Sequence, residues 1–289
     1  MDVVVFGAGS LGSLVGGLCA REHDVTLVGR DPHVAAVRES GLTVTGAVEL
    51  AVEPDARTTV PDHADLALVT VKSFDTQAAA RALTDCDPEV VCSLQNGLGN
   101  EERLARTHDT VLAGTCTYGA RLDGPGRVAC TGVGEVVVGD PDGGPSTAAE
   151  RVGSALRAAD IDAQVSTRMA RRRWEKLAVN AGVNPVTALA GVSNGALADD
   201  PLHEIATAAA RETARVAREN DVDLSDGKAV AALESVVETT AENHSSMLQD
   251  VRANNRTEVD AINGAVVARA DEPAPVNRTL AGLVRGRTD

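Results

Sequence analysis

Three side chains suited to proton transfer and hydrogen bonding recur every four residues in the second half of the chain: Lys176, Asn180 and Asn184. In a helix this spacing places all three on one face. Lysine is scarce, because Lys72, Lys176 and Lys228 are the only lysines among 27 basic residues. A buried ammonium can release a proton, whereas a guanidinium cannot. Lys176 is therefore a candidate acid, although a compositional bias with random survivors would explain the same scarcity.

Apolar residues surround this stripe, so the helix that carries it should be largely buried. Buried polar side chains must find partners or face a cavity. Beside a ketone, the ammonium of Lys176 would stabilise the alkoxide that forms on hydride addition and would supply its proton. The alternative for Lys176 is a plain surface lysine. Asn184 also fits the N-cap of a new helix with Pro185 at its first position, which is compatible with a role in the site.

A second polar set lies further along the chain, around Ser246 and Glu258. Ser246 and Gln249 have the spacing of a capping box, and Glu258 fits an acid in the first turn of a helix. Taken singly, these structural explanations are the stronger ones. Combined with the stripe, the set indicates a site in which Glu258 holds Lys176 or accepts a hydrogen bond from a substrate hydroxyl.

A glycine-rich turn follows the first apolar run, Val3 to Phe6, and opens a helical pattern. Gly7 would permit the tight turn, Gly9 the approach of a pyrophosphate, and Gly12 the packing of the helix on the strand. The helix N-terminus would then face the phosphates. An incidental glycine turn is the weaker alternative. The predicted nucleotide-binding residues here are Gly7, Ala8, Gly9, Ser10, Leu11 and Gly12.

The residues after the second apolar run bear on the choice of nucleotide. A site for NAD usually carries an acid there, which binds the ribose 2′-hydroxyl. This chain has Arg30, which suits a 2′-phosphate, followed by Asp31. Asp31 is either the displaced acid or an N-cap before Pro32, and we favour the N-cap. NADP (NADPH) is the predicted cofactor, with NADH as the alternative.

The elements that must position these residues divide the chain into two parts. We expect strands at Val3–Phe6, Val25–Val28, Leu66–Val71, Val90–Leu94, Val111–Tyr118, Arg127–Thr131, Glu135–Gly139 and Ala163–Val165. Helical patterns between several of them predict a mostly parallel sheet covered on both faces. From Arg168 onward the chain is helix-like. The fold class is an α/β Rossmann-type N-terminal domain, residues 1–166, followed by an all-helical C-terminal domain, residues 167–289.

Composition restricts the function classes. The net charge of −15 makes the chain a poor binder of nucleic acid or anionic membrane, and no apolar run is long enough for a membrane span. Five cysteines without a Cys-x-x-Cys pair, and histidines without a metal-binding pattern, predict a cytoplasmic protein without a metal site. Acidic residues, few lysines and few aromatic side chains suggest a halophilic protein.

At these residues the chain resembles the ketopantoate reductase (2-dehydropantoate 2-reductase) family over nearly its whole length. The matching motifs are Gly7–Gly12, Val71-Lys72-Ser73, Gln95–Asn100, Lys176-x-x-x-Asn180-x-x-x-Asn184-Pro185, Ser193-Asn194-Gly195, Ser245-Ser246-Met-x-Gln249-Asp250 and Thr257-Glu258. The last four sets together are far more specific than the glycine turn. The resemblance implies NADPH-dependent reduction of 2-dehydropantoate to (R)-pantoate, a step toward coenzyme A.

The resemblance also implies roles for individual residues. The family's proton donor matches Lys176. Its substrate-binding positions match Asn96, Asn180, Asn184, Asn194 and Ser246. Its nucleotide positions match the glycine turn, Arg30, Lys72, Asn96, Ala120 and Glu258. Two alternatives remain: a paralogue that reduces another branched 2-oxo acid, and a non-catalytic NADP-binding sensor. The expected partner is a small-molecule 2-oxo acid, and a homodimer is a candidate assembly.

Overall fold

The computed structural model describes residues 1–288 and divides into two units. The first unit comprises Met1–Gln95 and Asn100–Met169, and the second comprises Asn96–Gly99 and the residues from Ala170 onward. The predicted boundary at residues 166 and 167 lies near this division. The prediction placed segment 96–99 in the first domain, whereas in the structure this segment packs within the helical unit.

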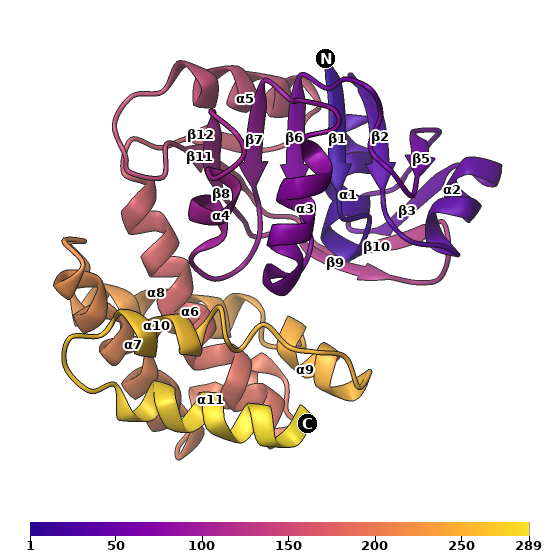
Figure 1. The fold of residues 1–289 in the computed structure, drawn as a ribbon. Helices are drawn as coiled ribbons and strands as arrows, with labels where there is room; N and C mark the ends of the chain where they lie inside the picture. The colour runs from indigo at the N-terminus through magenta and orange to yellow at the C-terminus, as the bar shows by residue number, and fades with distance from the viewer. Residues whose placement is uncertain (289) are drawn as a thin grey trace. The chain divides into compact units, whose positions relative to one another are not determined.

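A sheet of eight strands forms the centre of the first unit (Figure 1). Its strands are β1 (Asp2–Phe6), β2 (Asp24–Val28), β5 (Asp55–Arg57), β6 (Leu66–Val69), β7 (Val90–Ser93), β8 (Val111–Cys116), β11 (Val136–Gly139) and β12 (Ala163–Val165). The strand order is β12-β11-β8-β7-β6-β1-β2-β5. All neighbours are parallel except β8 and β11, so the predicted mostly parallel sheet is confirmed.

Alternating side chains of these strands enter two separate cores. Val3 and Val5 pack with helices α1 and α5 on one face, and Val4 packs with α3 and α4 on the other. This alternation follows from the two-residue period of a strand. Because both faces are covered, the central strands β1, β6 and β7 are almost entirely apolar. The helices of this unit are α1 (Ser10–Cys19), α2 (His33–Ser40), α3 (Thr76–Leu83), α4 (Asn100–Leu104), α5 (Thr147–Ala158) and the 3-10 turn η1 (Ser73–Asp75).

A second, four-stranded sheet was not predicted. Its order is β4 (Leu50–Val52), β3 (Leu42–Gly46), β10 (Arg127–Gly132) and β9 (Gly119–Leu122). The predicted strand at Arg127–Thr131 is confirmed, but it belongs to this sheet, where it pairs with β3 in parallel and with β9 antiparallel. The sheet packs on α1 through Leu42, Val44 and Val128. Its strands are short and partly exposed, so their hydrophobic pattern in the sequence is weak.

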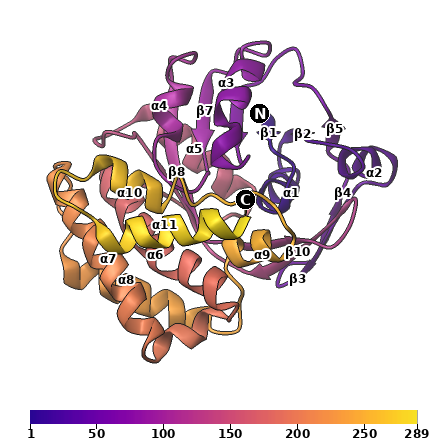
Figure 2. The ribbon, with the colours of Figure 1, turned by 60° about the horizontal axis from the view of Figure 1, so that its bottom comes forward.

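The second unit is helical, as expected. Its elements are α6 (Met169–Ala190), the 3-10 turn η2 (Asn194–Ala198), α7 (Leu202–Glu219), α8 (Asp226–Thr239), α9 (Ser246–Arg252), α10 (Asn263–Arg269) and α11 (Pro275–Thr288). Small side chains allow close packing, and at Gly182 an added Cβ would lie 2.6 Å from the carbonyl oxygen of Ala206 in α7. Helix α11 packs on α7 and α10 (Figure 2).

Helix α6 is continuous through Pro185. The expectation that Asn184 caps a new helix at Pro185 is therefore wrong. Proline is unfavourable within a helix, because it lacks the N–H that would bond the carbonyl four residues earlier. Here that carbonyl, of Ala181, accepts a hydrogen bond from the side chain of Asn263 at 2.9 Å. The helix continues because a distant side chain supplies the missing donor.

Among the described helices, none combines the length and the apolar character that crossing a membrane requires.

Candidate nucleotide-binding and catalytic sites

The glycine turn lies at the carboxyl end of β1, where close packing excludes larger residues. Gly7 has a φ of +118°, and an added Cβ would lie 2.6 Å from the backbone nitrogen of Val71. At Gly12 an added Cβ would lie 2.2 Å from the carbonyl oxygen of Gly7. The amides of Gly7 and Ala8 both donate to the carbonyl of Val28, each at 2.9 Å. These contacts agree with a tight turn and a helix packed closely on its strand.

Gly9 differs from its two neighbours in the motif. An added Cβ there would meet one protein atom, the Gly7 carbonyl oxygen, at 3.9 Å. Gly9 is also the N-cap residue of α1, and no side chain caps this helix. The first amides of the helix therefore remain available as donors, and the helix dipole favours an anion at this position. Open space beside uncapped amides fits a pyrophosphate.

Arg30 follows β2 at the same edge of the sheet as the glycine turn. Its side chain is 89% exposed and bonds the Asp75 carboxylate, at the start of α3, at 3.3 Å. Asp31 does not cap α2, because Pro32 occupies the N-cap position and the helix has no side-chain cap. The favoured N-cap interpretation of Asp31 is therefore wrong. Lys72 follows β6 as the N-cap residue of η1. Two basic side chains thus follow strands next to the glycine turn.

A buried histidine joins α1, α2 and the loop between β9 and β10. His33 Nε2 lies 2.9 Å from the Ser13 hydroxyl, and the amide of Gly126 donates to His33 Nδ1 at 3.2 Å. Burial lowers the pKa of His33, which favours the neutral ring that this bond to Nδ1 requires. The amide of Leu122 in β9 also donates to Ser10 Oγ at 3.2 Å. These bonds fix β9, which carries the predicted nucleotide residue Ala120, on α1.

The five cysteines are buried, and none of them forms a disulfide bond: Cys19, Cys86, Cys92, Cys116 and Cys130. Burial raises the pKa of Cys19 and of Cys92 to about 12, so both remain thiols at neutral pH. Within residues 1–288, no three His, Cys, Asp or Glu side chains form a metal-ligating group.

The stripe of Lys176, Asn180 and Asn184 lies on α6, as predicted. Leu177, Ala178 and Val179 on the other faces of this helix are buried in the helical core. Lys176 and Asn180 are half-buried, and Asn184 is buried with 6% exposed. Between Lys176 and Asn184, the stripe is thus the polar edge of a helix whose other side chains are buried.

Segment 96–99 brings two predicted residues together. Asn96 Nδ2 donates to the Glu258 carboxylate at 3.3 Å, and Glu258 is buried with 5% exposed. The amide of Leu98 donates to the carbonyl of Ala261 at 3.1 Å. Gly97 has a φ of +84°, and an added Cβ would lie 2.4 Å from that same carbonyl oxygen. Glycine at 97 therefore allows the close approach that joins Asn96 to Glu258.

Ser246 is exposed at the first position of α9. The predicted capping box is wrong by one residue, because Ser245 is the N-cap and accepts from the Leu248 amide at 3.2 Å. The Ser245 hydroxyl also bonds Thr187 of α6 at 2.7 Å. Ser245 therefore fixes α9 to α6 and leaves the Ser246 hydroxyl without a capping role.

Asn194 is buried, with its side-chain amide bonded to the Thr240 hydroxyl at 2.9 Å. Its Oδ1 atom is buried without a hydrogen-bond partner. The roles of Thr187 and Asn263 were not predicted from the sequence, because each bonds a residue that is distant in the chain. Gly97 lies within the Gln95–Asn100 motif, but the sequence does not show that its φ is positive.

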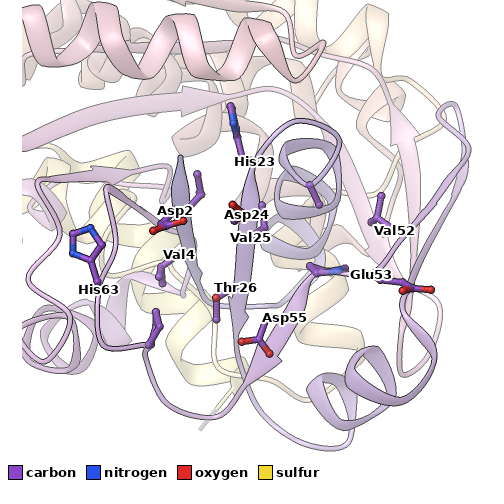
Figure 3. A pocket seen from close by; sticks show the side chains of 14 residues that line it. Asp2, Val4, His23, Asp24, Val25, Thr26, Val52, Glu53, Asp55 and His63 are labelled. Carbon is purple, nitrogen blue, oxygen red and sulfur yellow. The ribbon is translucent and has the colours of Figure 1, made fainter.

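A pocket of about 470 Å³ lies at the opposite edge of the large sheet (Figure 3). It is lined by the first residues of β1, β2 and β5, whereas the glycine turn follows the carboxyl end of β1. Four carboxylates line it: Asp2, Asp24, Glu53 and Asp55. Such a lining repels phosphates and carboxylates. This pocket is therefore unsuited to NADP or to a 2-oxo acid.

A smaller, largely apolar pocket of about 390 Å³ lies in the helical unit. Its lining includes Leu197, Leu233 and Val237, and His203 Nε2 lies 3.6 Å from a carboxylate oxygen of Glu234. None of the predicted site residues lines it. The predicted site residues therefore lie outside both pockets.

The fold and the residues described above define a class of protein: an α/β unit of the dinucleotide-binding kind, followed by a helical unit that carries the stripe of Lys176, Asn180 and Asn184. The chain belongs to the ketopantoate reductase PanE/ApbA family. The family's N-terminal region matches residues 3–143, and its C-terminal region matches residues 168–288.

Relatives named 2-dehydropantoate 2-reductase match over nearly the full length. The protein of Archaeoglobus fulgidus is 43% identical, with 98% of this chain and 97% of the relative covered. The protein of Halobacterium salinarum is 44% identical, with 99% and 98% covered.

Solved structures share the fold. A PanE/ApbA family ketopantoate reductase from Ralstonia eutropha has a TM-score of 0.89 at 32% identity, covering 100% of this chain and 99% of its own. D-mandelate dehydrogenase with NADH and anilino(oxo)acetate has a TM-score of 0.94 at 25% identity, with the same coverage.

Proposed function

We propose that this protein reduces 2-dehydropantoate to (R)-pantoate with NADPH, and that Lys176 donates the proton to the carbonyl oxygen. The observation that carries the proposal is the α6 stripe, a lysine and two amides on the polar edge of a buried helix, in a chain of the ketopantoate reductase family. The close relatives named 2-dehydropantoate 2-reductase support the choice of substrate.

The α/β unit supplies the nucleotide-binding residues. The uncapped amides at the start of α1 bind the pyrophosphate, and Gly9 leaves it room to approach. Arg30 binds the 2′-phosphate with its exposed guanidinium, for which it must exchange part of its bond to Asp75. Lys72 and Ala120 complete the proposed nucleotide set. When bound, NADPH supplies the hydride for the carbonyl carbon.

The helical unit supplies the residues that act on the substrate. The ammonium of Lys176 stabilises the developing negative charge on the carbonyl oxygen and then transfers a proton to it. Asn180, Asn184 and Ser246 bind the carboxylate and hydroxyl groups of the substrate without adding net charge. Asn194 is proposed to accept a hydrogen bond from a substrate hydroxyl through its Oδ1, which has no partner within the protein.

Asn96 and Glu258 act as a pair. Because Asn96 donates to the Glu258 carboxylate, that bond orients the side-chain amide of Asn96. The Glu258 carboxylate is held in the helical unit, where it accepts from a substrate hydroxyl or orients Lys176. This arrangement favours a 2-oxo acid that also carries a hydroxyl group.

A second candidate function is the reduction of a different 2-oxo acid with NADH. The structural similarity to D-mandelate dehydrogenase with NADH and an oxoacetate compound supports it. Asp31, which does not cap α2, is the acid that would serve a ribose 2′-hydroxyl.

Steady-state turnover with a panel of 2-oxo acids separates the two functions. The panel contains 2-dehydropantoate, the same skeleton without its hydroxyl, and 2-oxo-2-phenylacetate, each with NADPH and with NADH. We expect the highest kcat/KM for 2-dehydropantoate with NADPH, and a clear loss without the hydroxyl. A preference for 2-oxo-2-phenylacetate with NADH would establish the second function. Absence of turnover with every pair would contradict both and favour a sensor.

A further inference from the structure

Helix α6 contains a defect at the centre of its polar stripe. Pro185 lacks the N–H that would bond the carbonyl of Ala181, and its ring crowds the same carbonyl. Ala181 lies between Asn180 and Asn184 and is fully buried. The turn that sets Asn184 relative to Lys176 is thus the one that lacks its own hydrogen bond.

Asn263 fills this gap from the start of α10. Its Nδ2 donates to the carbonyl of Ala181 at 2.9 Å and to Oδ1 of Asn277 in α11 at 3.0 Å. Asn263 has no exposed surface. Turning its amide over would set Oδ1 against two acceptors, so the two bonds fix the orientation of the side chain.

The side chain of Asn277, which accepts a hydrogen bond from Asn263, is itself held in place. Asn277 Nδ2 donates to the carbonyl of Ala209 at 3.1 Å and to the Glu212 carboxylate at 3.0 Å. The amides of Val276 and Asn277 also donate to Glu212, each at 2.9 Å. A carboxylate on α7 therefore holds the start of α11 through three bonds, two of them donated by Asn277. Asn277 in turn holds Asn263, and Asn263 holds α6.

We propose that Asn263 is a positioning residue for the reduction, because it supplies the hydrogen bond that Pro185 withholds and so keeps Lys176, Asn180 and Asn184 on one face. The proposal rests on the proposed function. In this role Asn263 has no contact with substrate and acts through the backbone of α6.

The test removes the side-chain donor at position 263 and then supplies a backbone N–H at position 185 in its place. Asn263→Leu keeps a similar volume without the N–H groups. Pro185→Ala returns a backbone N–H to the Ala181 carbonyl. We compare Asn263→Leu, Pro185→Ala, the double variant and Asn220→Ala. Asn220 is the control, because its Nδ2 also donates to two backbone carbonyls, those of Val216 and Arg269, but not to α6.

We measure kcat and KM with 2-dehydropantoate at saturating NADPH, and the melting temperature. A small misplacement of reacting groups is costly, so Asn263→Leu should lower kcat/KM by at least about tenfold, mostly through kcat. The double variant should return to within about threefold of the parent. Its melting temperature should stay low, because the bond to Asn277 is still missing. Pro185→Ala and Asn220→Ala should keep parental kinetics.

Kinetic recovery without recovery of melting temperature is the result that a merely structural role would not give. If Asn263→Leu fails to fold, a folded double variant with near-parental kcat/KM supports the proposal equally. Asn263→Leu within twofold of the parent would overturn it, as would a kinetic loss that persists in the double variant.

Hydrogen exchange of the α6 peptides gives a readout that does not depend on activity. Residues 181–190 should exchange faster in Asn263→Leu and regain protection in the double variant. Unchanged protection would contradict the proposal. If protection changes as expected while the parent reduces no 2-oxo acid, the proposed function fails and the inferred repair of α6 stands.

Discussion

Arg30 is the residue on which the proposed nucleotide preference depends. It follows β2 beside the glycine turn, and its guanidinium is exposed except for one bond to Asp75. A hydrogen bond to a charged group contributes about 1.5–3 kcal/mol, so Arg30→Ala should raise the Kd of NADPH by roughly 10- to 100-fold. The Kd of NADH should change little, because it has no 2′-phosphate.

Isothermal titration of both nucleotides tests this expectation. Arg21→Ala is a suitable control, since Arg21 is another arginine of the same unit in an exposed ion pair, with Asp160 at 3.5 Å. An equal change in the Kd of NADPH and of NADH in Arg30→Ala would show that Arg30 does not bind the 2′-phosphate.

At the scale of elements, segment 96–99 is held to the turn before α10 by Gly97 and Leu98. Gly97→Ala introduces a Cβ 2.4 Å from the Ala261 carbonyl oxygen, so the segment must shift and Asn96 must move away from Glu258. We expect kcat/KM for 2-dehydropantoate to fall by about tenfold or more.

Gly191→Ala is the matched control for this variant. Gly191 has a φ of +74°, but an added Cβ meets no atom within 4 Å. The two variants therefore share backbone strain, and Gly97→Ala alone adds the collision. Similar kinetics in the two variants would contradict a role for the close approach.

Elements with a continuous local pattern could be predicted from the sequence, and those that depend on distant partners could not. The central strands of the large sheet, such as β1, β6 and β7, are apolar on both faces, so their runs were recognisable. The edge strand β5 has the sequence Asp-Ala-Arg and was not predicted. Pro185 indicated a helix break, because the donor that compensates for it belongs to Asn263. The Asn96–Glu258 bond likewise joins residues that no sequence spacing relates. The types and spacing of Lys176, Asn180 and Asn184 were sufficient to place the stripe on one helix.

At the scale of the whole molecule, charge repulsion opposes folding. The chain has 42 acidic and 27 basic residues, and four carboxylates line the pocket of Figure 3. Raising the ionic strength from about 0.1 M to 1 M shortens the Debye length from about 10 Å to 3 Å and weakens this repulsion. We propose that the protein is adapted to high salt.

The melting temperature should therefore rise as KCl increases from low to molar concentration. The same series with the protein at lower pH is the control, because protonated carboxylates no longer repel one another and the effect of salt should shrink. A melting temperature that stays constant or falls with KCl at neutral pH would contradict salt adaptation.

We propose that Lys176 protonates the carbonyl oxygen of the substrate. Lys176→Arg keeps the positive charge but cannot release a proton at neutral pH, and Lys176→Ala removes both. The direct measurement is the rate of pantoate formation from 2-dehydropantoate at saturating NADPH for the parent and both variants, together with the Kd of NADPH. We predict a fall in kcat of at least about 100-fold for both variants, with little change in the Kd. Pantoate formation at a near-parental rate in Lys176→Arg or Lys176→Ala would contradict the claim.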